Sequence, residues 1–203
     1  ARFTNSFTRT GGLSQDITPL VIEKIRKFIQ TFPKVLEDME RLVNRNRIFV
    51  DRTKGVGILT REEALSRSAT GPIARASGIT RDLRKDEPYL AYADFDFTVP
   101  CSKVGDCFAR YLVRQAEMRE SLKIIAQALE NIPAGPINVM PAERTTLPSK
   151  KMVYMTIEGT INHFELAMTN RGFETPHEES YSAIEAPNGE LGFYLVGNGT
   201  DVA

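Results

Sequence analysis

Residues 104–131 read VGDCFARYLVRQAEMRESLKIIAQALEN, and this stretch decides the fold class. Its apolar residues recur every three or four positions, which is the spacing of one face of an α-helix. They are Phe108, Tyr111, Leu112, Met118, Leu122, Ile125 and Leu129. Pro133 follows shortly afterwards, and proline does not continue a helix. The stretch therefore predicts one long helix that buries this face.

A charged stripe borders the apolar face of this predicted helix. Its members stack over one another at helical spacing, and they are Asp106, Arg110, Arg114, Glu117 and Ser121. One interpretation is an ion ladder on the surface, worth only about 0.3–0.5 kcal/mol per pair. The other is a semi-buried network, facing a cavity or a partner, in which the two arginines pair with the two carboxylates. The sequence leaves both open.

Two helical segments precede this one. Residues 17–46 carry apolar residues at helical spacing, and we expect Pro33 to break or kink the helix. The two parts of this stripe are Leu20, Ile22, Ile25, Phe28 and Ile29, then Val35, Leu36, Met39, Leu42 and Val43. Thr60 and Glu63 have the spacing of a capping box, which predicts a short helix through Leu65.

Two further segments contrast in their patterns. Residues 69–100 carry few helical signals, and a polar segment of this length inside a compact domain is often functional. Residues 152–169 predict an amphipathic helix, with Gly172 as its stop. We expect its inward side chains to be Val153, Ile157, Ile161, Phe164 and Met168. His163 lies off the centre of this stripe, where a structural role is more usual than a catalytic one.

The segment SAIEAPNGELGFYLV, residues 182–196, predicts a β-hairpin. Pro187-Asn188-Gly189 supplies the turn, because proline sets its own φ and glycine tolerates a positive φ. A hairpin needs only the turn, yet Glu185 and Glu190 flank it. They could cap backbone donors or bind a basic partner. With the helices, the hairpin makes the expected fold class α+β, mostly α.

Length and composition suggest a single domain over residues 1–203. Apolar residues make up 41% and charged residues 26%, as in ordinary globular proteins. The 26 basic residues balance 26 acidic ones, which argues against a general nucleic-acid binder. No apolar run is long enough to span a membrane, and we expect no signal peptide.

The residues that usually hold metals or nucleotides are scarce. Cys101 and Cys107 fit neither a zinc site nor a redox pair, so we expect two free thiols in a reducing compartment. His163 and His177 are the only histidines, and His177 lies in a loop where we expect solvent exposure. No glycine-rich nucleotide motif is present. We therefore expect no metal and no flavin bound by this chain.

Several longer motifs together resemble one known family. They are ARFTNSFTRTGG near residue 1, FPKVLEDMERLVNRNRIF, GPIARASGITRDLRKDEPYLAYADFDFTVP, GDCFARYLVRQAEMRESLKII and IEAPNGELGFYLV. In this order they are similar to the D subunit of respiratory complex I, the proton-pumping NADH:quinone oxidoreductase. The resemblance covers essentially the whole chain.

The same resemblance extends to the large subunit of nickel–iron hydrogenases. GPIAR and EAPNGEL are similar to that family's GPLAR and EAPRGEL. The resemblance implies a hydrogenase-like helical core and a hairpin that once framed a metal site. Asn188 stands where the hydrogenases have arginine, and the cysteine pairs that ligate their metals are absent from this sequence.

The chain departs from the complex I family in two respects. It has about half the length of the family's full subunit, so we expect a central fragment or a truncated product. The amino-terminal hairpin with its quinone-binding histidine, the tyrosine after it and the carboxy-terminal segment are missing. In addition, Thr4 stands where many members have a histidine close to the terminal iron–sulfur cluster. Threonine does not titrate near neutral pH as histidine does.

The resemblance implies a role in quinone reduction. Electrons from NADH pass along iron–sulfur clusters in partner subunits to a quinone held between this subunit and its cluster-bearing neighbour, and membrane subunits then pump protons. The implied location is peripheral, on the cytoplasmic face of the inner membrane (the matrix side in mitochondria). The candidates for the quinone pocket or the cluster-proximal region are Thr4, Arg9, Arg75, Arg81 and Arg84. Alternatively, Arg81 and Arg84 lie in a solvated, charged loop.

Two other functions stay open at this point. One is a hydrogenase-like subunit with metal chemistry, against which the missing cysteine pairs argue. The other is a non-catalytic scaffold that folds and binds partners, which is the expectation for the isolated chain.

Overall fold

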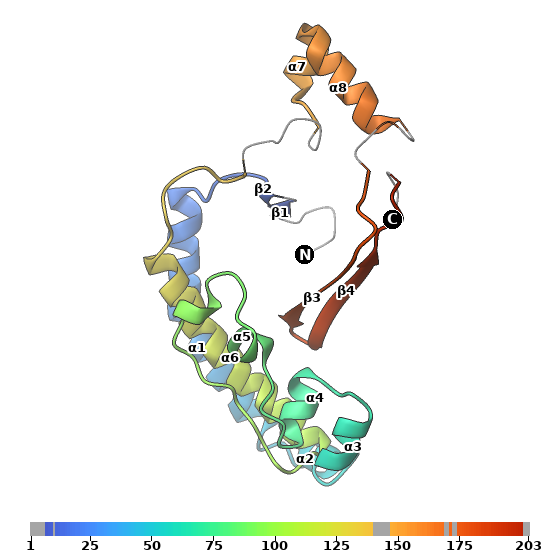
Figure 1. The fold of residues 1–203 in the computed structure, drawn as a ribbon. Coiled ribbons are helices and arrows are strands. Elements are labelled where there is room, and N and C mark those ends of the chain that lie inside the picture. The colour runs from blue at the N-terminus through green and yellow to red at the C-terminus, as the bar shows by residue number, and fades with distance from the viewer. Residues whose placement is uncertain (1–6, 10, 140–146, 169–170, 172–173, 201–203) are drawn as a thin grey trace. The chain divides into compact units, whose positions relative to one another are not determined.

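The computed structural model describes residues 7–9, 11–139, 147–168, 171 and 174–200 (Figure 1). The chain divides into two compact units. The larger consists of Ile17–Ala134 and Ala183–Gly192, and the smaller of Ala1–Asp16, Gly135–Ser182 and Phe193–Ala203. Each is described by itself below, and the single domain suggested by the sequence stays a prediction.

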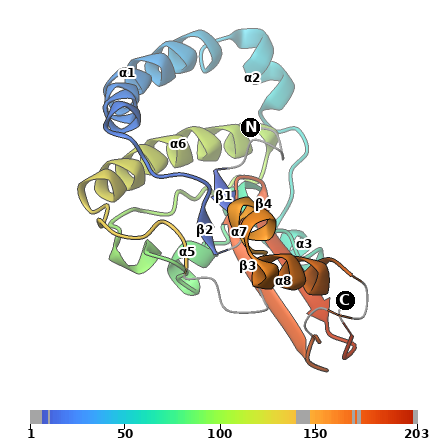
Figure 2. The same ribbon diagram turned by 90° about the horizontal axis from the view of Figure 1, so that it is seen from above.

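Helices are the main regular elements of the larger unit. Its elements are α1 (Pro19–Val43), α2 (Arg47–Thr53), α3 (Arg61–Ser66), α4 (Gly71–Ala76), α5 (Leu83–Asp86), the 3₁₀ turn η2 (Tyr92–Asp94) and α6 (Cys107–Glu130). The two long helices, α1 and α6, pack against each other, and α2 and α4 also contact α6, whereas α3 contacts α4 and α5 contacts η2 (Figures 1 and 2). The expected α+β class agrees with a chain that is about half helical and carries a small antiparallel sheet.

Helix α6 confirms the long predicted helix, with a later start. Asp106 is its N-cap, and the carboxylate accepts a hydrogen bond from Ala109 N at 2.7 Å. The core contact lies along the small residues Ala109 and Val113, which pack with Ala76 of α4. Leu112, expected to be buried, is 39% exposed, because α4 covers the neighbouring side of the helix.

Helix α1 runs through Pro33 without a break, which corrects one of the two outcomes expected there. Leu36, three residues further on, is fully buried, so packing holds the helix together where proline removes a backbone bond. The helix ends at Val43, and Asn46 then caps α2 by accepting from Ile48 N and Phe49 N. The sequence pattern did not predict α2.

The short helices follow local capping chemistry. Thr60 and Glu63 form the complete capping box of α3, as predicted. The segment 69–100, expected to carry little helix, contains α4, α5 and η2. Asp82 accepts a bond from Arg84 N at the start of α5. Side-chain caps and tertiary packing therefore fold a segment that lacks amphipathic periodicity.

The predicted hairpin is confirmed. Strand β3 (Glu179–Ala186) pairs with β4 (Gly189–Val196) across the Pro187–Asn188 turn. Gly189 has φ +135°, a conformation that other residues rarely adopt.

The smaller unit contains short elements. Strands β1 (Thr8–Arg9) and β2 (Gly12–Leu13) are antiparallel, with Thr8 opposite Leu13. Helix α7 (Lys150–Met155) and helix α8 (Ile157–Ala167) replace the single helix predicted over 152–169. The break occurs at Thr156, whose hydroxyl accepts from Gly159 N and so caps α8.

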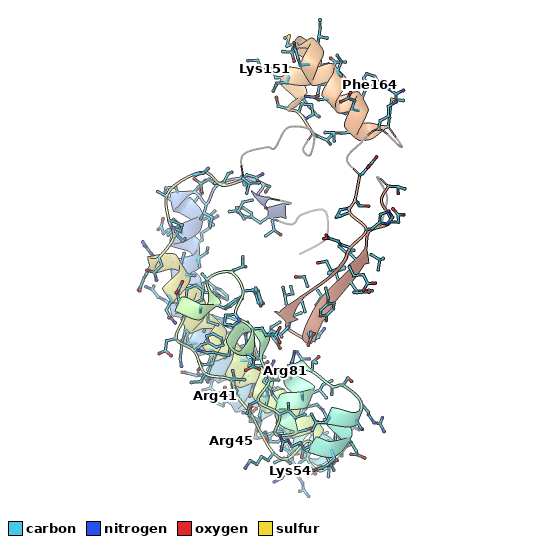
Figure 3. The ribbon with its side chains drawn as sticks, in the orientation of Figure 1. Arg41, Arg45, Lys54, Arg81, Lys151 and Phe164 are labelled. Carbon is cyan, nitrogen blue, oxygen red and sulfur yellow. The ribbon has the colours of Figure 1, made fainter. Side chains whose placement is uncertain are left out.

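The inward face predicted for this helix is wrong. The exposed fractions of Ile157, Ile161, Phe164 and Met168 are 75, 50, 58 and 48%, and Val153 is half-buried. Phe164 projects from α8 in Figure 3. The reason is that α7 and α8 meet at Gly159, where a Cβ would lie 2.5 Å from the backbone of Met152, and not through the apolar stripe.

The remaining expectations have plain outcomes. His163 is half-buried beside the ring of Phe164, and His177 is exposed, as predicted. Cys101 and Cys107 are free thiols. Gly172 lies outside the described residues. Within the described ranges, no helix is both long and apolar enough to cross a bilayer.

Candidate functional site

Two sequence motifs meet in the larger unit through a pair of glycines. Gly71, at the start of α4, has φ +66°, and a Cβ on it would lie 2.4 Å from the Cα of Gly189 in the hairpin turn. Backbone therefore packs on backbone, which only glycine permits. Thr70 completes the contact, since its hydroxyl accepts from Glu190 N at 3.0 Å. The GPIAR and EAPNGEL motifs are thus side by side.

Arg75 lies at the centre of this junction with only 2% of its surface exposed. Its Nε donates to Glu117 of α6 at 2.7 Å, and its Nη1 donates to Glu185 of β3 at 2.8 Å. Nη1 also donates to the carbonyl of Arg81 at 3.1 Å and lies 3.8 Å from Asp82. One buried guanidinium therefore ties α4, α6, the α5 region and the hairpin together.

A second ion pair, between Arg84 and Asp82, lies beside Arg75. Asp82 is fully buried and accepts from Arg84 Nε at 3.0 Å and Nη2 at 2.7 Å, a bidentate arrangement. The guanidinium of Arg84 lies over the ring of Phe97 at 5.1 Å and near that of Tyr92 at 5.9 Å. These rings fix the second cation beside the first.

Glu185 has further partners besides Arg75. Its second oxygen accepts from Leu83 N at 3.3 Å, at the start of α5. Its backbone N donates to the hydroxyl of Tyr89 at 3.1 Å. Within the chain, Glu185 therefore both pairs with a basic group, Arg75, and caps the backbone donor of Leu83. Glu190 lies 3.6 Å from Arg81, which is half-exposed and also lies 3.5 Å from Glu87. Arg81 is labelled in Figure 3.

Arg114 reaches the hairpin turn from α6. Its Nη1 donates to the carbonyl of Pro187 at 3.1 Å and its Nη2 to Asn188 Oδ1 at 3.2 Å. Position 188 is asparagine, and the guanidinium of Arg114 contacts the turn from α6. Arg114 and Arg75 both border a cavity of about 470 Å³. Its walls comprise Arg75, Arg84, Tyr92, Arg114, Glu117, Met118, Ser121, Glu185, Ala186 and Pro187.

The environment moves the pKa values of the cluster in different directions. Burial raises the pKa of the Glu117 carboxyl above its ordinary value, and Arg75 offsets this only in part. Burial acts the same way on Asp82, but the bonds from Arg84 outweigh it and lower the pKa of that carboxyl. The pKa of Arg75 is raised, because Glu185 and Glu117 outweigh the effect of burial. The cluster therefore favours the protonated form of Glu117 more than that of Asp82.

The predicted stripe on α6 does not pair with itself, which corrects the network proposed for it. Asp106 accepts from Gly55 N and Ala109 N. Arg110 donates to the carbonyls of Gly105 and Gly57 and to Cys107 Sγ. Arg114 binds the hairpin turn and Glu117 binds Arg75, as above. Because the stripe runs along much of the length of α6, its four charged members meet several neighbouring segments, whereas Ser121 Oγ donates to the carbonyl of Glu117.

The remaining candidates lie elsewhere. Arg9 is in β1, in the smaller unit, and Thr4 lies outside the described residues. Sequence reasoning missed Asp82 as a site residue, although Asp-X-Arg spacing just before a short helix is a recognisable cap and ion-pair signal. It also missed the tyrosine at position 89, since nothing local predicts its bond to Glu185. Across the described ranges, no group of three or more potential metal ligands comes together.

Comparison with known proteins agrees with these motifs. The model of the family "Respiratory-chain NADH dehydrogenase, 49 Kd subunit" matches residues 1–203. The D subunit of NADH-quinone oxidoreductase from Methylacidiphilum infernorum is 47% identical over 202 residues, which is 100% of this chain and 48% of the relative. The corresponding protein of Salinibacter ruber is 48% identical over 98% of this chain and 44% of its own. That of Rhodospirillum rubrum is 43% identical over 99% and 50%.

The chain therefore spans about half the length of the curated relatives it matches. The match runs through every motif that builds the Arg75 cluster and the hairpin. The chain belongs to the family of the 49-kDa subunit of respiratory-chain NADH dehydrogenase, whose bacterial members are named as the D subunit of NADH-quinone oxidoreductase.

Proposed function

We propose that this chain helps to form the quinone-reduction site of NADH:quinone oxidoreductase and takes part in coupling electron transfer to proton translocation. One observation carries the proposal: a buried cluster of arginines and carboxylates borders a cavity where the GPIAR and EAPNGEL motifs meet. Family membership supports the oxidoreductase class, and the printed names of the relatives include quinone.

The cluster suits a site at which charge changes during reaction. Reduction of a quinone to a quinol takes up two electrons and two protons, so negative charge develops at its oxygens before protons arrive. Arg75, Arg84 and Arg114 supply fixed positive charge, because arginine does not lose its proton. Glu117 has the raised pKa expected of a group that exchanges protons with a cavity. Electrons would come from the iron–sulfur clusters of a partner subunit.

The partners and the location follow from this proposal. The cluster-bearing subunit would lie beside this chain, with other quinone-module subunits and the membrane subunits nearby. The chain would be peripheral, on the cytoplasmic face of the inner membrane or the matrix side in mitochondria. The fold is proposed to keep a hydrogenase-like helical core without that family's metals.

The test uses the complete subunit assembled in its complex. Arg75→Lys keeps the positive charge but cannot donate from Nε and Nη1 in the same fork geometry. We expect it to lower the rate of quinone reduction by NADH while leaving NADH:ferricyanide activity, which bypasses the quinone site, unchanged. Arg119→Lys is the matched control, because Arg119 pairs with Glu40 on the α1 side of α6. Equal quinone reductase rates in both variants would overturn the proposal.

A scaffold function is the second candidate, favoured by a specific observation. Each carboxylate of the cluster has a direct cationic partner within it, with Glu117 and Glu185 sharing Arg75, so no carboxylate of the cluster needs a ligand to pair with. A purely structural cluster would lower complex assembly and quinone reduction in parallel when Arg75 changes. The amount of assembled complex, measured by native gel, separates this outcome from a loss of turnover.

A further inference from the structure

One row of large apolar side chains on α1 is exposed. Its members recur at every seventh residue, and they are Val21, Phe28, Val35 and Leu42. Their exposed fractions are 39, 44, 49 and 71%. Seven residues make about two helical turns, so these side chains follow one another along the helix. We call them the outer row.

The outer row is distinct from the side of α1 that packs on α6. A second set at the same spacing, Ile22, Ile29, Leu36 and Val43, is buried or half-buried. The bond of Arg119 to Glu40, 2.7 Å long, ties this side to α6. The intervening positions are Ile25, Phe32 and Met39, and Phe32 stacks on Phe28 at 4.8 Å. The apolar surface of α1 is thus wider than its contact with α6 requires.

With the intervening positions, the outer row has the spacing of a coiled-coil seam. The steps from Val21 through Ile25, Phe28 and onward to Leu42 alternate between four and three residues. This alternation places knobs for a second helix along the whole length of α1. Pro33 lies off the seam and does not interrupt it.

The side of α1 beyond the outer row is basic. Its cations Lys24, Lys27, Lys34 and Arg45 are exposed and form no ion pair within the part of the chain that the structure describes. Two carboxylates lie near these cations. Asp38 is on the same side of the helix and pairs with Arg41 at 2.7 Å. Glu23 lies at the edge of the basic side that is farther from the outer row. Figure 3 shows Arg41 and Arg45 at the end of this helix. An apolar seam with one basic flank favours a binding partner whose facing side chains are acidic.

We propose that the outer row binds an amphipathic, acidic helix of a partner protein, with an apolar heptad seam and glutamate or aspartate beside it. Charge complementarity decides among the occupants. A second copy of this chain would bring basic flank against basic flank. A lipid surface would need a broad exposed apolar face, whereas Ile25 and Phe32, which lie beside the outer row, are half-buried. This interaction is independent of the proposed quinone site.

The test uses the full chain and a synthetic peptide of four heptads with leucine at a and d and glutamate at e and g. The comparison peptide has lysine at e and g. We expect fluorescence anisotropy to show the acidic peptide binding at least about tenfold more tightly. Phe28→Lys should abolish the binding. Phe164→Lys, at a comparably exposed position on α8, should leave it unchanged.

A charge-reversed variant keeps the proposal testable if Phe28→Lys does not fold. Changing Lys24, Lys27 and Lys34 to glutamate alters only exposed side chains, and circular dichroism checks the fold. The preference should then reverse towards the lysine peptide. Equal binding of both peptides, or binding insensitive to these changes, would overturn the proposal. So would self-association or anionic-vesicle binding that depends on Phe28 in the absence of peptide binding.

Discussion

At the residue scale, Arg75 decides how the larger unit holds together. It is almost fully buried, and it binds carboxylates from two elements that are far apart in sequence. A buried cation is tolerated only because these carboxylates compensate it, so the members depend on one another. The sequence drew attention to Arg75 through its glycine-bearing motif, but its partners could not be predicted, because they come from long-range contacts.

Removal of Arg75 should be strongly destabilising. Arg75→Ala leaves Glu117 and Glu185 buried without their cation, at an expected cost of about 3–5 kcal/mol in the free energy of unfolding. Urea denaturation measures it. Arg81→Ala is the control, because Arg81 is half-exposed and should cost less than about 1 kcal/mol. A loss below about 1 kcal/mol for Arg75→Ala would show that the cluster contributes little.

The two carboxyls of the cluster should respond to pH in opposite directions. The folded pKa of Glu117 is raised, so its contribution to stability is full below its unfolded pKa and is lost as pH rises through the folded value. The folded pKa of Asp82 is lowered, so its contribution is present above its unfolded pKa and is lost as pH falls through the folded value. Each is measured as the difference in unfolding free energy between the wild type and Glu117→Gln or Asp82→Asn.

With rising pH, the difference for Glu117→Gln should therefore fall and that for Asp82→Asn should grow. The pH range over which each stability difference changes begins near the pKa of the unfolded state, about 4.3 for glutamate and about 3.9 for aspartate. It extends upward for Glu117 and downward for Asp82. Parallel slopes for the two variants would contradict the assignment.

At the element scale, the hairpin and α4 form one unit of packing. The turn matters through its backbone, as Gly189 has a positive φ and meets Thr70 and Gly71. The hairpin and its turn were predictable, because Pro-Asn-Gly between alternating apolar runs is a local signal. The break between α7 and α8 was not, because it depends on a backbone contact at Gly159 that no periodicity reveals.

Gly189→Val should destabilise the chain more than Asn188→Ala. A valine there would be strained by its φ, at about 1–2 kcal/mol or more, and its Cβ would lie 2.5 Å from Thr70 Oγ1. Asn188→Ala removes one hydrogen bond from Arg114, worth about 0.5–1.5 kcal/mol. Thermal unfolding compares the two. The reverse order would mean that the asparagine side chain holds the turn.

The coupling energy between Arg114 and the hairpin turn should be modest. Arg114 is exposed and bonds a carbonyl and an amide, so its removal leaves no buried charge. A double-mutant cycle of Arg114→Ala and Asn188→Ala should give a coupling energy of about 0.5–1.5 kcal/mol. A coupling of about zero would mean that the contact does not contribute in solution.

At the scale of the whole molecule, fold class and family were predictable, while the site was predictable only in part. Long periodic helices and a local turn give the class. The assembly of Arg75 with Glu117 and Glu185 requires knowing which helices pack, and this is decided by small residues such as Ala109 and Val113 that carry no distinctive pattern. The exposure of Ile157 and Phe164 likewise reverses an expectation based on periodicity alone.

The purified chain should contain no stoichiometric metal or flavin. The sequence has no ligand cluster or nucleotide loop, and the Asn188→Arg variant would restore the hydrogenase-like residue without the cysteine ligands. Elemental analysis and visible absorption of both proteins should therefore agree. Nickel or iron bound in equal amount to protein would contradict this, and would revive the hydrogenase-like alternative.

The contact between Gly71 and Gly189 sets a rule for building chimeras within this family. Because the two backbones touch without intervening side chains, neither partner can be adjusted to suit a foreign counterpart by changing a neighbouring residue. In a recombinant whose crossover lies between α4 and the hairpin, Gly71 and Gly189 come from different parents, although they form the closest backbone contact between the two segments. Recombinants that take both segments from one parent keep this contact, so the two motifs should be exchanged together.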